Sequence, residues 1–302
     1  MSINLVQASP RDLGGGLAPV GPLALGLWRY TTDDLDAAAG LLEAAVDLGM
    51  NLVDNADVYG FDWGGSGFGA CEELLGRVLA NRPGLRDRIV LATKGGIAPP
   101  VPYDSGPEAL RAACEASLRR LGVERIDLYQ VHRPDMYTHP AEVAATLDRL
   151  IADGKVGAVG VSNHTPAQTA ALVAHLEAPL ATPQPEFSAA RLDPLRDGTL
   201  DQCAATGMVP LAWSPLAGGS LASGDGLRSE LVEVLDRLAE REGVDRATVA
   251  VAFVLAHPTA PVAIVGTQQP TRLEALARAP GVTLDRNDVY DLIEASDGVP
   301  LP

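Results

Sequence analysis

The sequence has few cysteines, and their arrangement excludes a disulfide framework and a cysteine-rich metal site. The 302-residue chain has three cysteines, Cys71, Cys114 and Cys203, which are widely separated. Their number is odd, and none forms a Cys-x-x-Cys pair or lies beside a histidine at metal-ligand spacing. We therefore expect reduced thiols in a cytoplasmic protein that holds no metal.

Basic patches and long apolar runs are also missing. Lys and Arg number 23 against 39 Asp and Glu, so the net charge is −16. An acidic chain of this kind is not expected to bind nucleic acid. No run reaches the roughly 18 apolar residues of a membrane helix, and the first residues lack the cationic and apolar regions of a signal peptide. We expect no membrane partner, and the oligomeric state stays open, with a monomer among the options.

Short apolar segments alternate along the chain with longer helical patterns. Apolar residues make up 47% of the sequence, which is ample for a sizeable core. The short segments are apolar throughout, as is typical of parallel strands covered on both faces. The expected strands are residues 22–28, 50–56, 88–94, 126–132, 156–163, 180–188, 208–215 and 261–267. The expected helices are residues 32–49, 69–81, 105–122, 139–154, 165–176, 195–207, 229–242, 245–256 and 269–279, with another within 284–298.

Eight strand–helix units in this length predict an α/β fold of the (β/α)₈ barrel type, with one domain over residues 1–302. The alternative is a doubly wound open sheet, whose first strand is normally followed by a Gly-x-Gly-x-x-Gly turn. The glycine-rich residues 12–21 precede any strong strand and open no helix, so we expect a loop or short hairpin there. Thr32 or Asp33 is expected to cap the first helix, and Gly49 to end it.

Reactive or polar side chains follow the expected strands. Asp54 and Tyr59 follow the second strand, Lys94 ends the third and His132 ends the fourth. Each has an ordinary structural reading, such as a turn, a solvated edge or a satisfied buried histidine. In a barrel, however, all eight carboxyl ends meet at one mouth, where active sites lie. The later strands add Ser162 and Asn163, Gln184, Trp213 and Ser214, and Gly266 and Thr267.

The first four of these side chains suggest one chemical unit. A tyrosine with an ordinary pKa of about 10 needs a nearby positive charge to exchange its proton near neutral pH. Lys94 can supply that charge, and Asp54 can keep Lys94 protonated. His132 can donate a hydrogen bond that orients a carbonyl oxygen. The unit can move a proton to or from an oxygen but contains no hydride source, so it predicts carbonyl/alcohol redox chemistry with a hydride from a cofactor.

Five segments then resemble motifs of the aldo-keto reductase superfamily. They are "NLVDNADVYG" at 51–60, "VLATKGG" at 90–96, "IDLYQVHRPD" at 126–135, "GKVGAVGVSNHTPAQ" at 154–168 and "PLAWSPLAGG" at 210–219. They occur in order and at family-like spacing, within a match of roughly residues 20 to 280. The short C-terminus is similar to that of bacterial reductases.

The resemblance implies a (β/α)₈ barrel that binds NADPH across its mouth and reduces aldehydes or ketones to alcohols. Tyr59 would be the general acid, Lys94 and Asp54 would tune it, and His132 would orient the carbonyl. The implied cofactor-binding residues are Ser162, Asn163 and Gln184 at the carboxamide; Trp213 stacked on the nicotinamide, if it is not simply a core aromatic; Ser214, Leu216 and Gly218 by the pyrophosphate; Gly26 and Trp28 near the ribose; and Asp54, Gly266, Thr267, Gln268 and Arg272.

Two departures from the family pattern affect cofactor and substrate. After the eighth strand the chain reads "GTQQPTRLEAL", so Arg272 is the one charged candidate for the 2′-phosphate of NADP⁺, and we expect NADH to be used beside NADPH. The short C-terminus predicts an open pocket. Its walls would be Trp28 and residues 61–69, 97–106 and 133–139. Phe61, Trp63 and Tyr103 would make it apolar and tolerant of aromatic groups, or would only pack the loops.

Two other functions stay open at this point. A barrel could keep the cofactor as a regulatory ligand for a protein partner, although a sensor need not retain all four reactive groups. A barrel aldolase could instead use Lys94 as a Schiff-base nucleophile. Asp54 opposes that role, because it would keep the amine protonated.

Overall fold

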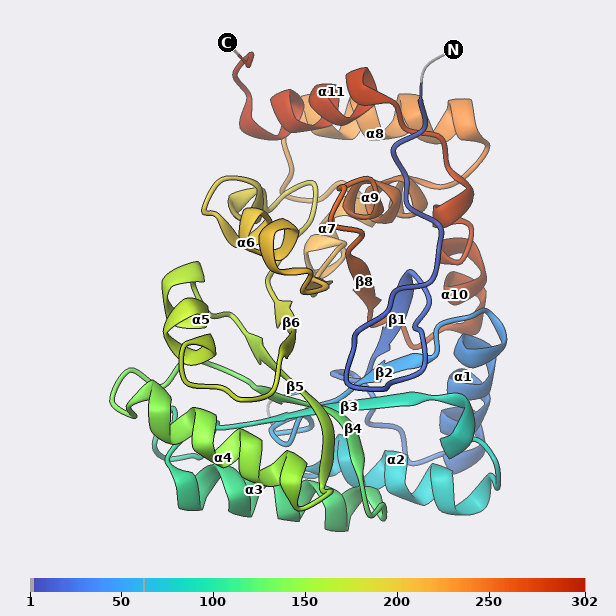
Figure 1. Cartoon of the computed structure of the whole chain (residues 1–302). Coiled ribbons are helices and arrows are strands. Elements are labelled where there is room, and N and C mark those ends of the chain that lie inside the picture. Colours follow the sequence, from blue (N-terminus) through green and yellow to red (C-terminus); the bar gives the residue numbers. More distant parts are fainter. Residues whose placement is uncertain (1–2, 62, 302) are drawn as a thin grey trace.

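The eight strands form one parallel sheet that is rolled into a nearly closed barrel (Figure 1). The computed structural model describes residues 3–61 and 63–301. The hydrogen-bonded order is β6-β5-β4-β3-β2-β1-β8-β7. The barrel prediction is therefore confirmed, and the open doubly wound sheet is excluded. The strands are β1 Leu23–Gly26, β2 Leu52–Asp54, β3 Val90–Gly95, β4 Ile126–Val131, β5 Val156–Ser162, β6 Leu180–Gln184, β7 Leu211–Ala212 and β8 Val262–Val265.

The ring closes between β6 and β7 through backbone hydrogen bonds from residues that flank β7. The amide of Trp213 donates to the carbonyl of Pro185 at 3.0 Å, and the amide of Val209 donates to that of Ala181 at 3.1 Å. β7 is much shorter than the expected 208–215, because Pro210 and Pro215 flank it and a proline has no amide for the ladder.

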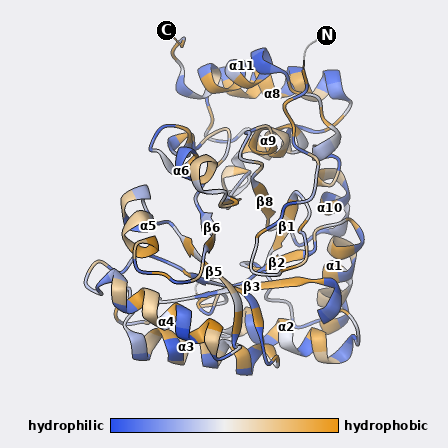
Figure 2. Ribbon diagram, in the orientation of Figure 1, coloured by the Kyte–Doolittle hydropathy of each residue, from blue (hydrophilic) through white to orange (hydrophobic). Residues whose placement is uncertain are grey.

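The α-helices lie around the barrel, with apolar faces turned to the interior of the protein and polar faces outward (Figure 2). Most of them begin and end within a few residues of the predicted ranges, and the short α7 was not predicted. They are α1 Leu35–Asp47, α2 Ala70–Asn81, α3 Pro107–Leu121, α4 Pro140–Ala152, α5 Pro166–Val173, α6 Thr199–Thr206, α7 Ser220–Ser223, α8 Ser229–Glu242, α9 Arg246–Leu255, α10 Pro270–Leu276 and α11 Arg286–Asp297.

The N-terminal cap of α1 differs from the prediction. Asp34 is the capping residue and accepts from the amides of Asp36 and Ala37, both at 3.0 Å. Thr32 instead accepts from the amide of Asp34 at 3.1 Å, which presents the Asp34 carboxylate to the helix. The end of the helix is as predicted, since Gly49 has the left-handed φ of 84° that favours glycine.

A short hairpin covers the amino-terminal end of the barrel. Arg11 and Val20 exchange backbone hydrogen bonds of 2.7 and 2.8 Å, so the hairpin expected near residues 12–21 is present. It places Leu13 and Val20 in a buried cluster with the first residues of several strands, Leu52 among them. Because the strand side chains fill this end, the free space lies at the opposite, carboxyl end of the strands.

The last helix, α11, packs on α8 (Figure 1), where Arg241 forms a double hydrogen bond with Asp288. No described residue of α11 lines the cavity at the mouth, so the predicted openness on this side is observed. Within residues 3–61 and 63–301, no helix combines the length and apolarity needed to cross a membrane.

Candidate active site

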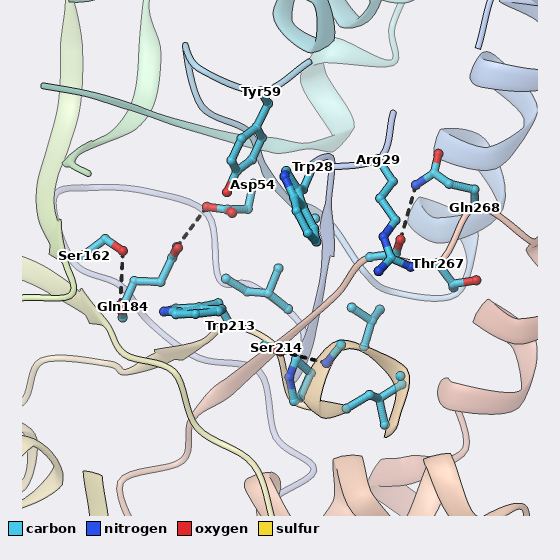
Figure 3. Close-up of a pocket in the computed structure, with 18 of the residues that line it drawn as sticks. Trp28, Arg29, Asp54, Tyr59, Ser162, Gln184, Trp213, Ser214, Thr267 and Gln268 are labelled. Atoms are coloured by element: carbon cyan, nitrogen blue, oxygen red, sulfur yellow. Dashed lines mark hydrogen bonds between the residues drawn. The ribbon is translucent and has the colours of Figure 1, made fainter. Parts of the chain in front are cut away.

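A cavity of about 1300 Å³ lies at the carboxyl ends of the strands (Figure 3). Asp54, Tyr59 and Gln184 lie at one end of the view, and Thr267 and Gln268 lie at the other. All the predicted site residues line this cavity except Lys94, whose side chain is fully buried. They are Gly26, Trp28, Asp54, Tyr59, His132, Ser162, Asn163, Gln184, Trp213, Ser214, Leu216, Gly218, Gly266, Thr267, Gln268 and Arg272.

Lys94 joins Asp54 and Tyr59 into one hydrogen-bonded unit. Its Nζ lies 2.7 Å from Asp54 Oδ2, 3.1 Å from the Tyr59 hydroxyl and 2.9 Å from the carbonyl oxygen of Asn55. An ammonium group has three donors, so these three contacts use all of them. The unit forms because β2 and β3 are parallel neighbours and place Asp54 and Lys94 at the same edge.

The charge on Lys94 is maintained by its neighbours. Burial alone lowers the pKa of the ammonium, but Asp54 and Tyr59 outweigh burial and raise the pKa above its usual value. A protonated amine with every donor engaged is a poor nucleophile. This geometry argues against a Schiff base at Lys94.

The pKa of Tyr59 does not follow the sequence-based expectation in full. Burial of the phenol raises its pKa, while the charge of Lys94 lowers it, and burial is the stronger of the two. The expected influence of Lys94 is present, but the sequence could not reveal that burial of the phenol outweighs it. Tyr59 is therefore a protonated phenol over the whole neutral range and is suited to act as a proton donor.

His132 is a neutral imidazole at the edge of the same unit. Burial first, and then the charges of Lys94 and Arg133, lower its pKa well below the usual value. Its ring stands edge-on to that of Tyr59, with centroids 5.8 Å apart. Nδ1 is buried and has no hydrogen-bond partner among the described residues, which leaves Nε2 as the nitrogen able to reach a ligand.

Two glutamines hold the second oxygen of Asp54. Gln184 Nε2 donates to Asp54 Oδ1 at 3.0 Å, and Gln130 Nε2 donates to the same atom at 3.3 Å. Ser162 donates its hydroxyl to the backbone carbonyl of Gln184 at 3.2 Å. Gln184 therefore supports Asp54 as well as lining the cavity. Gln130 was not predicted, because an amide inside an apolar strand carries no signal of which face it occupies.

Asn163 fixes the orientation of Trp213. The indole Nε1 donates to Asn163 Oδ1 at 3.0 Å, and the amide of Asn163 donates to Ser162 Oγ at 2.8 Å. Asn163 has a left-handed φ of 58°, and so does Ser214, at 54°. Residues other than glycine adopt this conformation at a cost and are enriched at ligand sites.

Helix α2 anchors the segment that carries Tyr59. The amide of Cys71 donates to the Tyr59 carbonyl at 3.3 Å. The next residue, Glu72, is completely buried; it accepts from Thr93 Oγ1 at 2.6 Å and pairs with Arg120 at 2.7 Å. Since Thr93 precedes Lys94, the hydrogen bond between Thr93 and Glu72 connects β3 to the segment that carries Tyr59. Sequence reasoning missed Glu72, since a glutamate in the first turn of a helix is ordinary.

The predicted aromatic wall is only partly present. Trp28 and Tyr103 line the cavity, and Trp63 packs on Trp28 with centroids 4.9 Å apart. Phe61 does not line the cavity and is about half exposed, so its predicted role in the wall is wrong. Asp62, in the same loop, lies outside the described residues.

Three arginines line the cavity: Arg272, which was predicted; Arg133, which lies in the predicted wall segment 133–139 but was not singled out; and Arg29, which was not predicted. Arg29 lies over the rings of Trp28 and Trp63, at 5.3 and 4.8 Å from their centroids, and Figure 3 shows it at the end of the view with Thr267. Arg133 follows His132. A single arginine within a loop gives no sign of its direction, so neither Arg29 nor Arg133 could be singled out from spacing.

The described residues of the cavity include no cluster of metal-ligating side chains. Across the described residues, no group of three or more His, Cys, Asp or Glu side chains could hold a metal ion. The three cysteines are buried and unpaired, as expected.

Comparison with known proteins agrees with this geometry. A model of the aldo/keto reductase family matches residues 22–297. The chain belongs to this family. It is 48% identical to a 6-dehydroglucose reductase of Novosphingobium aromaticivorans, over 97% of both chains. It is 36% identical to a 6-dehydroglucose reductase of Agrobacterium fabrum, over 91% of this chain and 94% of that protein.

Solved aldo/keto reductase structures share the barrel. The glycerol dehydrogenase of Gluconobacter oxydans has a TM-score of 0.81 and is 30% identical, over 98% of this chain and 97% of its own. An aldo/keto reductase of Klebsiella pneumoniae, solved with NADP and acetate, has a TM-score of 0.79 and is 26% identical, over 97% and 96%. Membership of the family makes this chain an oxidoreductase.

Proposed function

We propose that this aldo/keto reductase uses NADPH to reduce aldehydes or ketones to alcohols, with Tyr59 as the general acid. The observation that carries the proposal is the contact of Lys94 with both Asp54 and Tyr59, beside a cavity large enough for a dinucleotide. The cofactor would supply a hydride to the carbonyl carbon, and every other step falls to the protein's own side chains.

In this mechanism Tyr59 gives its proton to the carbonyl oxygen as negative charge develops there. Lys94 stays charged beside the phenol and stabilises the phenolate that remains, while Asp54 prevents Lys94 from losing its proton. Neutral His132 donates from Nε2 to the same oxygen and orients it. None of these groups has to move far, since hydrogen bonds already hold Asp54 and Lys94.

The residues around the cavity fit a nicotinamide dinucleotide. Asn163, Ser162 and Gln184 offer amide and hydroxyl groups for the carboxamide, next to the flat face of Trp213. Away from Tyr59, Ser214 closes a tight turn by accepting from the amide of Gly218 at 3.0 Å, which leaves a loop beside the expected pyrophosphate. Arg29 and Arg272 supply positive charge for phosphate groups.

For the substrate we propose 6-dehydroglucose, a hexose with an aldehyde at C6. The support is the 48% identity to a 6-dehydroglucose reductase over almost the whole of both chains. The cavity offers Trp28 and Tyr103 as apolar surface and Arg133 as a donor for hydroxyl groups near Tyr59. The open side, which α11 leaves uncovered, gives room for a sugar ring.

The proposal is tested by following the loss of reduced-nicotinamide absorbance with 6-dehydroglucose and a panel of simpler aldehydes and ketones. We expect turnover with NADPH, and slower or comparable turnover with NADH. If the protein reduces simple aldehydes but not 6-dehydroglucose, the proposed substrate is wrong and the proposed carbonyl reduction stands. Tight cofactor binding with no turnover of any carbonyl would favour a regulatory role for the cofactor over catalysis.

Arg272 is expected to decide between the two cofactors. The change Arg272→Met should weaken NADPH binding by about 10- to 100-fold, because hydrogen bonds from a charged donor contribute about that much to affinity. NADH binding should change little. Dissociation constants for both cofactors can be measured by quenching of tryptophan fluorescence. Arg278→Met is the matched control, because Arg278 is exposed just beyond α10 and donates to the Gly243 carbonyl instead. Equal weakening of both cofactors would contradict a 2′-phosphate contact.

A further inference from the structure

No acidic side chain of residues 3–61 and 63–301 pairs with the three arginines that line the cavity. None of Arg29, Arg133 and Arg272 has an acidic side-chain oxygen within 4.0 Å among the described residues. This is notable in a chain of net charge −16, where many surface arginines are paired. Unpaired guanidinium groups at a cavity are available to a ligand.

Two of the three lie where cofactor phosphates are expected. Arg29 lies with Thr267 and Gln268 at the end of the view away from Tyr59 (Figure 3), and Arg272 is on α10, which begins just beyond them. The third, Arg133, is at the reacting end, since it directly follows His132 at the end of β4. It is left for the substrate.

Hydrogen bonds hold the chain on both sides of Arg133, and none of these bonds uses its guanidinium. The amide of His132 donates to the carbonyl of Gly95 at 2.8 Å, which fixes the end of β4 against β3. The next acid along the chain, Asp135, is occupied. Its Oδ2 accepts from the amide of Ser105 at 3.0 Å and from Thr138 Oγ1 at 2.7 Å, and its Oδ1 accepts from the amide of Tyr137 at 2.9 Å.

Other walls of the cavity favour a substrate with a carbon skeleton of some size. Trp28 is 44% exposed and Tyr103 is 37% exposed, so both offer aromatic surface to a ligand. Trp63 backs Trp28, which stiffens that wall. Ile97 and Val58 add apolar contacts. Such a site combines apolar walls with one forked donor next to the reacting atoms.

From this arrangement we infer that Arg133 is a specificity-determining residue that selects carbonyl compounds carrying hydroxyl groups close to the carbonyl. Its guanidinium donates to two hydroxyl oxygens of the substrate, while Tyr59 and His132 contact the carbonyl oxygen. The inference rests on the proposed carbonyl reduction. A carboxylate could accept from the same fork, but the substrate proposed above is a neutral aldehyde whose acceptors are hydroxyl oxygens, and the test below separates the two classes.

The test compares aldehydes that are matched in carbon number and differ in hydroxyl groups. The ratio of kcat/KM for glyceraldehyde to that for propanal is measured in the wild type and in Arg133→Met. We expect this ratio to fall by about 10- to 100-fold, mainly through KM for glyceraldehyde, because the variant loses hydrogen bonds from a charged donor. Arg133→Lys should give a smaller fall, since its single ammonium lacks the fork.

Arg77→Met is the matched control, because Arg77 is exposed on α2 away from the cavity, and the ratio should stay at the wild-type value. An unchanged ratio in Arg133→Met overturns the inference. The inference is also overturned if Arg133→Met lowers only the ratio of kcat/KM for succinic semialdehyde to that for butanal. Arg133 would then select an anionic group. If the wild type reduces no aldehyde, the proposed function fails instead, so the two failures are distinguishable.

Discussion

Replacing Tyr59 by Phe is expected to lower kcat for aldehyde reduction by about 10²- to 10⁴-fold, the usual contribution of a positioned general acid. The change removes only the hydroxyl that lies 3.1 Å from Lys94 and leaves the ring that packs edge-on to His132. Cofactor binding should survive, which fluorescence titration of the variant can establish. A variant that keeps near-normal turnover would remove Tyr59 from the mechanism.

The same assignment predicts opposite pH profiles for the two directions of the reaction. Reduction needs the protonated phenol, so its rate should fall as pH rises through the pKa of Tyr59. Because burial raises that pKa, the fall should lie on the alkaline side. Alcohol oxidation needs the phenolate, so its rate should rise over the same range. The Tyr59→Phe variant should lose both limbs. A limb that persists in the variant belongs to another group.

Replacing Lys94 by Met is expected to abolish measurable turnover and to destabilise the fold by about 3–5 kcal/mol, because the buried carboxylate of Asp54 loses its partner. Two losses are combined here: the charge that stabilises the phenolate, and the counter-ion of a buried acid. Urea unfolding of the cofactor-free protein measures the second loss separately from activity.

Two further variants make this prediction sharper. Lys155, the other lysine of the chain, pairs with Glu115 near the surface. Lys155→Met should therefore lower the free energy of unfolding by at most about 1 kcal/mol and leave turnover unchanged. Adding Asp54→Asn to Lys94→Met should restore part of the stability but none of the turnover, because the double variant no longer buries an unpaired charge. Equal instability of the two lysine variants would contradict the buried ion pair.

The repeated strand and helix patterns predicted the barrel well, for a simple physical reason. Parallel strands covered on both faces are mostly apolar, and the segments ending at Asp54 and Lys94 show this clearly. Because all the carboxyl ends of a closed barrel meet, the polar residues after the strands were placed at one mouth before their neighbours were known. Family motifs then suggested what each residue does.

Other features depend on three-dimensional neighbours that no local pattern contains. The direction of the Tyr59 pKa is set by how deeply the hydroxyl is enclosed. Arg133 stands out only once it is seen that the nearby acid Asp135 already accepts hydrogen bonds from other residues. Glu72 resembles any acid in the first turn of a helix until its burial against Thr93 is seen. The cap of α1 was misplaced because Thr32, Asp33 and Asp34 are all good capping residues, and only the backbone geometry selects Asp34.

The hairpin at the amino-terminal end has a consequence for the order of events during synthesis. Arg11 donates to the carbonyl oxygens of Ala260 and Pro261, and the amides of Leu5 and Gln7 donate to those of Leu284 and Leu255. Residues 5–11 therefore leave the ribosome long before the residues that they bind, which in the case of Arg11 follow 249 and 250 positions later. Until then the bottom of the partly built barrel stays open and its apolar residues are unprotected, so the newly made chain depends on rapid completion, or on a chaperone, to avoid aggregation.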